Sequence, residues 1–138
     1  MNAVTLERTV EHIYLIDDEE DSHFVTRLVL KKAGYAGRLS MFLSAGEAFR
    51  ALHQESPKPD LILVDINMPG TSGHEFVEAC ERSGMLPNGR SSVVMFSSSN
   101  RPQDMEAARD HACVMGYVEK ALTVDRFNLI IEQHRRRA

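Results

Sequence analysis

The feature that most constrains the fold of this 138-residue chain is a regular alternation of two apolar patterns. Short, nearly continuous apolar runs, typical of buried strands, alternate with segments whose apolar residues recur at helical spacing. The runs occupy residues 12–16, 38–43, 61–64, 93–96 and 115–118. Five such strand-then-helix units predict an α/β fold, in which a parallel sheet is covered by helices on both faces and linked by right-handed crossovers.

Capping and breaking residues predict where the first helix lies. Asp21 or Ser22 can cap it, and its apolar positions are Phe24, Leu28 and the stretch of residues 29–33. Gly34 ends it, because glycine adopts the left-handed conformation that commonly follows a helix.

The later helices have signals of the same kind. Ser44, with Glu47 three residues later, predicts a capping box for the second helix. Residues 75–82 form the third, and Pro102 suits the first turn of a fourth through residue 108. Thr123 can cap the last helix.

Composition and charge exclude several other classes of protein. The chain has the hydrophobic content of a globular domain, 43%, and no apolar run near the roughly 18 residues that a membrane-spanning helix needs. Its net charge of −4 disfavours a nucleic-acid partner, because such binding depends on cationic side chains. Cys80 and Cys113 form no short-spaced pair, and residues 1–11 lack the apolar core of a signal peptide. We therefore expect a cytoplasmic protein with no membrane partner.

Five polar residues stand where predicted strands end. They are Asp17 and Asp18 after the first strand, Asp65 after the third, Ser97 after the fourth and Lys120 after the fifth. In open parallel sheets, ligands bind outside the carboxyl ends of the strands. The sequence thus predicts one site at this edge of the sheet.

The chemistry of these side chains points to phosphoryl transfer. Two carboxylates about 4 Å apart repel by roughly 4 kcal/mol at an effective dielectric constant near 20, and a hard divalent cation such as Mg²⁺ relieves that cost. Lys120 can bind a phosphoryl oxygen and Ser97 can donate a hydrogen bond to it. A carboxylate in such a pocket can act as the nucleophile and form an aspartyl phosphate.

Four segments together resemble the receiver domain of two-component response regulators. They are residues 16–19 (IDDE), 61–70 (LILVDINMPG), 93–98 (VVMFSS) and 116–121 (GYVEKA). The resemblance implies a flavodoxin-like (βα)5 sheet with strand order 2-1-3-4-5. It covers residues 12–134, which leaves a short tail at 1–11 and a basic end at 135–138.

The resemblance also implies roles for the acidic residues. Asp65 matches the phosphoacceptor. Asp18, Asp65 and the backbone carbonyl of Asn67 match the ligands of Mg²⁺, and Asp17 would act on the ion largely through water.

The remaining positions concern the phosphoryl group and the response to it. Lys120 and Ser97 match the phosphate-binding residues, and Ser97 and Tyr117 match a pair of switch residues that move after phosphorylation. Asn67 and Ser99 stand where the family tunes hydrolysis of the phosphoryl group.

The implied partners are proteins. A histidine kinase or a histidine phosphotransfer protein would donate the phosphoryl group. The face built by the fourth helix, the last strand and the last helix would then change its affinity for a target. Only 18 residues follow Lys120, so we expect the signal to leave through a non-covalent partner or along a phosphorelay. We expect a monomer or weak dimer that is not a turnover enzyme.

One departure from the family pattern concerns the residue after the lysine. Receivers usually have proline there, often after a cis peptide bond, whereas this chain has Ala121. A cis bond to a residue other than proline costs roughly 2.5–4 kcal/mol. Either the bond between Lys120 and Ala121 is trans with an altered loop, or the surrounding structure holds a cis bond; we favour trans.

Two alternative functions stay open at this point. One is a phosphohydrolase with an aspartate nucleophile, although such enzymes typically place a second aspartate where this chain has Asn67. The other is an adaptor that uses the same fold without phosphorylation, which the intact acidic cluster disfavours.

Overall fold

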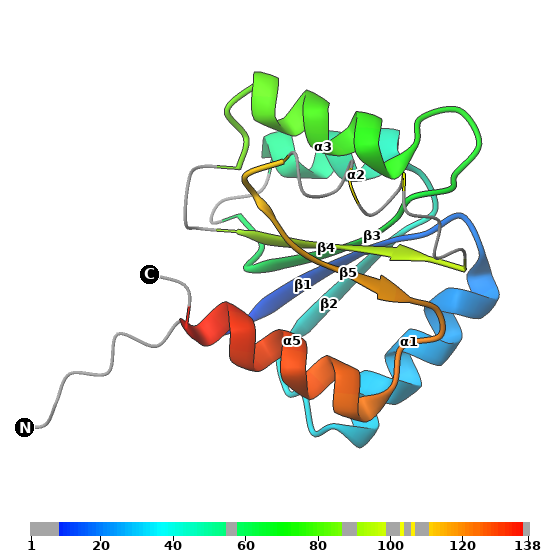
Figure 1. The fold of residues 1–138 in the computed structure, drawn as a ribbon, viewed down its shortest axis with the longest axis vertical. Helices are drawn as coiled ribbons and strands as arrows, with labels where there is room; N and C mark the ends of the chain where they lie inside the picture. The colour runs from blue at the N-terminus through cyan, green and yellow to red at the C-terminus, as the bar shows by residue number, and fades with distance from the viewer. Residues whose placement is uncertain are drawn as a thin grey trace, which may run out of the picture.

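A computed structural model describes residues 9–54, 58–86, 91–98, 103, 106 and 111–136. Within these ranges lie five strands: β1 (His12–Ile16), β2 (Arg38–Phe42), β3 (Leu61–Asp65), β4 (Ser92–Ser97) and β5 (Val114–Glu119). They form one sheet in the order β2-β1-β3-β4-β5, and the strand pairs are parallel (Figure 1). The predicted fold class and strand order are confirmed.

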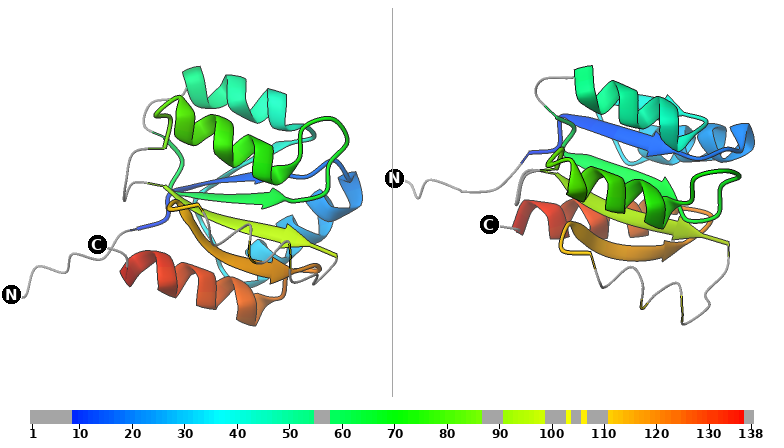
Figure 2. Two further views of the ribbon diagram at one scale, coloured as in Figure 1. Left: turned by 45° about the horizontal axis from the view of Figure 1, so that its top comes forward. Right: turned by 90° about the horizontal axis from the view of Figure 1, so that it is seen from above.

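Helices cover both faces of the sheet. Those described are α1 (Glu20–Lys32), α2 (Ala45–Gln54), α3 (Gly73–Arg82) and α5 (Val124–Arg136). Figures 1 and 2 show α1 and α5 on one face and α2 and α3 on the other. The helix predicted from Pro102 to residue 108 falls almost wholly outside the described residues. None of the described helices is both long and apolar enough to cross a bilayer.

The sheet separates two hydrophobic clusters. On one side, Phe76 and Val77 of α3 pack against β-strand residues such as Val64. On the other side, Leu30 of α1 and Phe127 of α5 pack in a second cluster. Every residue of β1, β3 and β4 is buried, which explains why these strands are continuous apolar runs rather than alternating ones.

Side chains cap three of the described helices, and two of these caps were predicted. The hydroxyl oxygen of Ser44 accepts from the Glu47 N–H over 3.2 Å, and that of Thr123 accepts from the Arg126 N–H over 3.1 Å. The third is a capping box between Ser72 and Glu75 at the start of α3, which begins two residues before the predicted position. These caps satisfy N–H groups that have no partner inside the helix.

The prediction for α1 was wrong in two respects. The helix starts at Glu20, and its cap position is Glu19, whose side chain makes no capping hydrogen bond. Phe24 and Leu28 do not face the core but are 55% and 42% exposed. Thr26 and Leu30 are the buried residues of α1, and Leu30 lies in the predicted apolar stretch 29–33.

The register of the sheet sets the position of the site. Ile16 pairs with Val64, Asp65 with Phe96, and Ser97 with Glu119. The ends of β1, β3, β4 and β5 therefore lie side by side at the carboxyl edge. Polar residues that follow these strands converge there.

Candidate functional site

Three carboxylates meet at the carboxyl edge of the sheet, as predicted. Asp17 and Asp18 follow β1, Asp65 ends β3, and one oxygen from each lies within 4.8 Å of the others. Asp17 and Asp65 are 0% and 3% exposed, and Asp18 is the more open of the three. Burying two carboxylates beside a third, more accessible one has a high free-energy cost unless a cation compensates their charge.

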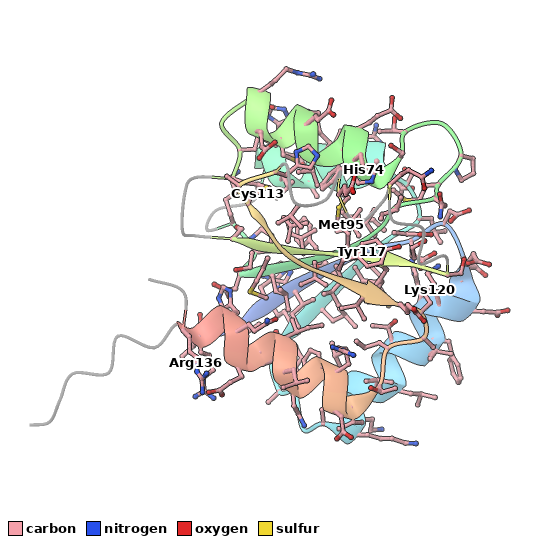
Figure 3. All side chains as sticks on the ribbon, in the orientation of Figure 1. His74, Met95, Cys113, Tyr117, Lys120 and Arg136 are labelled. Atoms are coloured by element: carbon pink, nitrogen blue, oxygen red, sulfur yellow. The ribbon has the colours of Figure 1, made fainter. Side chains whose placement is uncertain are left out.

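Lys120 supplies such a cation from the end of β5. Its Nζ lies 2.9 Å from Asp17 Oδ2, 3.2 Å from Asp65 Oδ2 and 3.1 Å from Glu19 Oε1. Its backbone N–H donates to the Ser97 carbonyl over 2.9 Å. Figure 3 shows Tyr117 partway along β5 and Lys120 at its end. The lysine is thus anchored through both its backbone and its ammonium group.

The peptide bond between Lys120 and Ala121 is cis, so the expectation of a trans bond was wrong. The other possibility, a cis bond, is the one present. Lys120 itself is fixed by its backbone bond to Ser97 and its ion pair with the buried Asp17.

The electrostatics of the site shift two pKa values. Burial, followed by the Asp17 charge, raises the pKa of Asp65 from 3.8 to about 6, although Lys120 and the Asn67 N–H oppose the shift. For Lys120, burial disfavours the charged form, but Asp17, Asp65 and Glu19 outweigh it and raise the pKa above its usual value. Lys120 therefore favours its protonated form, whereas the ionised form of Asp65 is less favourable than that of an ordinary aspartate.

Asn67 links the phosphoacceptor candidate to the switch candidate. Its backbone N–H donates to Asp65 Oδ1 over 3.1 Å, and its side-chain Nδ2 donates to Ser97 Oγ over 3.1 Å. Ser97 is fully buried at the end of β4. The predicted positions 65, 67 and 97 thus form one hydrogen-bonded unit.

A glycine lets the loop after Asp65 close against the next helix. A Cβ on Gly73 would lie 2.5 Å from the Asp65 carbonyl oxygen and 2.9 Å from the Ile66 Cα. The Gly73 N–H donates to the Ile66 carbonyl over 3.0 Å. Only a residue without a side chain fits there, so Gly73 sets the position of the Asp65 backbone.

The sequence analysis missed two residues beside the acidic cluster. No role was predicted for Glu19, but its carboxylate reaches Lys120 and its N–H donates to Asp17 Oδ1 over 3.0 Å. His23 Nε2 lies 2.7 Å from the Asp17 carbonyl oxygen and donates to it. The position of Glu19 directly after the aspartate pair was the available signal, and no motif singled out His23.

The other predicted residues lie as follows. Tyr117 is partly buried in β5 and packs against the cluster that contains Phe76 and Val77. It also lines a groove with Lys120 and Arg126. Ser99 lies outside the described residues, so its predicted role in hydrolysis is not placed.

The donor atoms around the cluster fit a hard divalent cation. All candidate ligands at Asp17, Asp18 and Asp65 are carboxylate oxygens, and no nitrogen or sulfur ligand joins this group among the described residues. Oxygen ligands of this kind suit Mg²⁺ and similar ions rather than zinc or copper.

Comparisons with known proteins agree with this geometry. The family model for the response regulator receiver domain matches residues 13–132. The two-component response regulator ORR41 of Oryza sativa subsp. japonica is 26% identical over 128 residues, which cover 93% of this chain and 97% of that protein.

Two solved structures are also similar. A two-component response regulator from Cytophaga hutchinsonii is 27% identical, with a TM-score of 0.83 over 92% of this chain and 98% of that one. The Mn²⁺-bound form of response regulator Rcp1 is 26% identical, with a TM-score of 0.70 over 88% of this chain and 90% of that one. With a family model that spans nearly the whole chain and an acidic site in the expected place, this protein belongs to the response regulator receiver domain family of two-component systems.

Proposed function

We propose that this receiver accepts a phosphoryl group on Asp65 from a phosphohistidine donor and passes the signal on through a protein partner. The observation that carries the proposal is the environment of Asp65. Its buried carboxylate has Lys120 3.2 Å away and two further carboxylates within reach of a shared cation. This combination provides a nucleophile, a fixed positive charge and a metal-binding group in one place.

The proposed step balances as follows. An oxygen of the Asp65 carboxylate attacks the phosphorus atom, and a P–O bond forms as the P–N bond of the donor breaks. The electron pair of that bond stays on the imidazole nitrogen, which takes up a proton. Asp65 loses its carboxylate charge as the P–O bond forms, and Lys120 holds an oxygen of the phosphoryl group, which carries the negative charge.

Mg²⁺ would bind at the acidic cluster, through Asp18, Asp65 and the carbonyl of Asn67, with Asp17 contributing through water. When bound, such an ion neutralises charge on the transferring group. Support comes from the all-oxygen donor set and from the metal-bound form of the similar Rcp1.

The donor protein would dock along α1. Phe24, Val25 and Leu28 are exposed apolar residues on this helix, and Val25 also lines a groove that leads to Asp17 and Lys120. An apolar helical face next to the site suits a helix that presents a phosphohistidine. We therefore assign this face to a histidine kinase or histidine phosphotransfer protein.

The outgoing signal would use the face of β5 and α5, together with the fourth helix. In this proposal Ser97 turns toward the phosphoryl group and Tyr117 follows it inward. Gly116, Tyr117 and Leu129 already line a groove between β5 and α5, which offers a surface that such a movement would reshape. We place this activity in the cytoplasm, where both cysteines stay as free thiols.

The test is phosphotransfer from a labelled phosphohistidine protein of the same organism. We expect Mg²⁺-dependent label on the wild-type chain and on Asp125→Asn, a change of an exposed acid on α5, but none on Asp65→Asn. Label that persists in Asp65→Asn would overturn the assignment of the phosphoacceptor.

The same material separates the two alternatives. Repeated release of phosphate from a generic ester substrate would favour the phosphohydrolase, because a receiver turns over only its own acyl phosphate. If a target bound equally well to wild-type and Asp65→Asn chains in the presence of a phosphodonor, the result would favour an adaptor that works without phosphorylation.

A further inference from the structure

We infer that His23 is a positioning residue for the acidic cluster. Its hydrogen bond to the Asp17 carbonyl oxygen fixes the peptide unit that joins Asp17 to Asp18, and so directs both carboxylates toward a shared cation. This inference rests on the proposed function and adds to it a residue from the first turn of α1.

The ring of His23 reaches back to the residue that follows β1. Its Nε2 lies 2.7 Å from the Asp17 carbonyl oxygen, and because a carbonyl oxygen only accepts, Nε2 must carry the hydrogen. The backbone N–H of His23 donates to the Glu19 carbonyl over 3.3 Å, so this residue belongs to the first turn of the helix. Helical side chains lean toward the amino terminus, which explains how His23 reaches the end of the strand.

The other polar atoms of Asp17 have partners elsewhere. Its N–H donates to the Phe42 carbonyl over 3.0 Å, which fixes the peptide unit before Asp17. Its carboxylate lies 2.9 Å from Lys120 Nζ through Oδ2 and accepts from the Glu19 N–H through Oδ1 over 3.0 Å. The bond from Glu19 closes a turn whose central peptide unit is the one between Asp17 and Asp18.

Such a turn does not determine the orientation of its central peptide unit. A turn closed by an aspartate side chain imitates a β-turn, and β-turns of types I and II differ by a flip of exactly that unit. The hydrogen bond from His23 to the Asp17 carbonyl oxygen selects one of the two orientations. It therefore also sets the direction in which the chain leaves toward Asp18.

Asp18 depends on this support because its own side chain is not held. Within the described ranges, the Asp18 carboxylate has no hydrogen bond or ion pair, although one of its oxygens lies within 4.8 Å of oxygens of Asp17 and Asp65. Like charges at this separation repel, and an open carboxylate turns toward water where its backbone allows. A fixed peptide unit opposes that movement and keeps the oxygen ligands arranged for a cation.

Two substitutions at position 23 separate the hydrogen bond from the other properties of the side chain. His23→Gln keeps an N–H donor on a side chain of similar reach, whereas His23→Met has similar length and no donor. Glutamine and methionine have similar helix propensities, so a difference between the two variants does not come from the helix. His53→Met, a change of an exposed histidine on α2, is the matched control.

The first test is calorimetric titration of each metal-free chain with Mg²⁺. We expect His23→Met to bind Mg²⁺ about three- to tenfold more weakly than wild type, the factor that one hydrogen bond supports. His23→Gln and His53→Met should keep nearly the wild-type affinity. Equal affinities of wild type and His23→Met, or an equal loss in His23→Gln, would overturn the inference.

NMR of the metal-free protein gives a second test that does not depend on a folded variant. In wild type, the imidazole nitrogen shifts of His23 should place the hydrogen on Nε2, and a neutral ring with its hydrogen on Nδ1 would contradict the inference. The Asp18 amide nitrogen shares its peptide unit with the Asp17 carbonyl. Its resonance should move in His23→Met and stay close to the wild-type position in His23→Gln.

Phosphorylation by acetyl phosphate distinguishes failure of this inference from failure of the proposed function. Because His23 acts through the cation site, His23→Met should be slow at low Mg²⁺ and approach the wild-type rate at saturating Mg²⁺. A loss that persists at saturating Mg²⁺ would show that His23 does not act through cation binding. If wild type itself gains no phosphoryl group on Asp65, the proposed function fails, whereas normal wild-type phosphorylation with unchanged Mg²⁺ affinity in His23→Met refutes only the role of His23.

Discussion

The side-chain amide of Asn67 donates a hydrogen bond to Ser97 Oγ over 3.1 Å, across the ends of two neighbouring strands. Asn67 is exposed, whereas Ser97 is fully buried. The contact joins the loop that follows the phosphoacceptor candidate to the residue proposed to respond to it. The hydroxyl of Ser97 is therefore positioned before any phosphoryl group is present.

We predict that Asn67→Ala loosens Ser97. One hydrogen bond is lost while the backbone N–H to Asp65 remains, so the free energy of unfolding should fall by about 0.5–1.5 kcal/mol. NMR signals of Ser97 and Tyr117 should shift toward the positions they take with Mg²⁺ and beryllofluoride. Asn128→Ala, a change of an exposed asparagine on α5, should leave both signals unchanged. Unmoved signals in Asn67→Ala would show that the amide does not hold the hydroxyl.

We predict that Asp65→Asn stabilises the metal-free protein at alkaline pH. The pKa of Asp65 is raised from 3.8 to about 6, so the folded state binds its proton more tightly than the unfolded state does. Between pH 4 and 6 the wild type then loses stability as the pH rises, by about 1–3 kcal/mol in total. Thermal melting at pH 8 should show Asp65→Asn above wild type, with the gap closing near pH 4. A constant gap across this range would contradict the prediction.

We predict that Lys120→Ala folds but becomes less stable above pH 6. The variant leaves Asp17 and Asp65 without their ammonium partner, and the pKa of Asp65 should rise further. The loss at pH 8 should be about 1–3 kcal/mol and should shrink at pH 5, where Asp65 takes up a proton. Denaturant unfolding of this variant beside Lys31→Ala, an exposed lysine of α1, is the measurement. Equal losses at both pH values would mean that the lysine stabilises mainly by packing.

We predict opposite effects for alanine at two glycines. In Gly73→Ala the new Cβ meets the Asp65 carbonyl oxygen at 2.5 Å, so the loop must shift. The free energy of unfolding should fall by about 1–3 kcal/mol, and phosphorylation should decrease. In Gly46→Ala the Cβ has only Arg50 Nη1 at 3.9 Å, and the helix should gain about 0.5–1 kcal/mol. Chemical denaturation measures both. A neutral Gly73→Ala would mean that the Asp65 loop tolerates displacement.

We predict that Leu28→Ser separates protein donors from small ones. Leu28 is 42% exposed on α1, so stability should change by less than about 0.5 kcal/mol. Phosphorylation by acetyl phosphate should stay at the wild-type rate, while phosphotransfer from a protein donor should slow at least about threefold, as expected for a lost apolar contact. If both donors slowed equally, α1 would not be the docking face.

The fold could be predicted from the sequence because the pattern of burial is simple. A strand covered on both faces must be apolar throughout, and the run of residues 61–64 shows that directly. The parallel arrangement then brings residues after different strands to one edge, which is why Asp17, Asp65 and Lys120 could be grouped in advance.

Other features depend on information that the sequence pattern does not contain. In α1, Phe24 and Leu28 were expected among the apolar positions with Leu30, but they are exposed, because only packing selects among residues that are equally apolar. The ion pair between Glu19 and Lys120 joins side chains 101 residues apart.

The cluster that contains Leu30 also includes Phe127 and Ile130. α1, proposed to bind the donor, and α5, proposed to bind the target, thus contribute to one hydrophobic cluster. This cluster lies on the opposite side of the sheet from Phe76 and Val77. A partner bound on α1 and a partner bound on α5 would therefore sit on two helices whose buried residues pack together. The proposed donor-binding face on α1 and the proposed target-binding face on α5 are therefore next to each other.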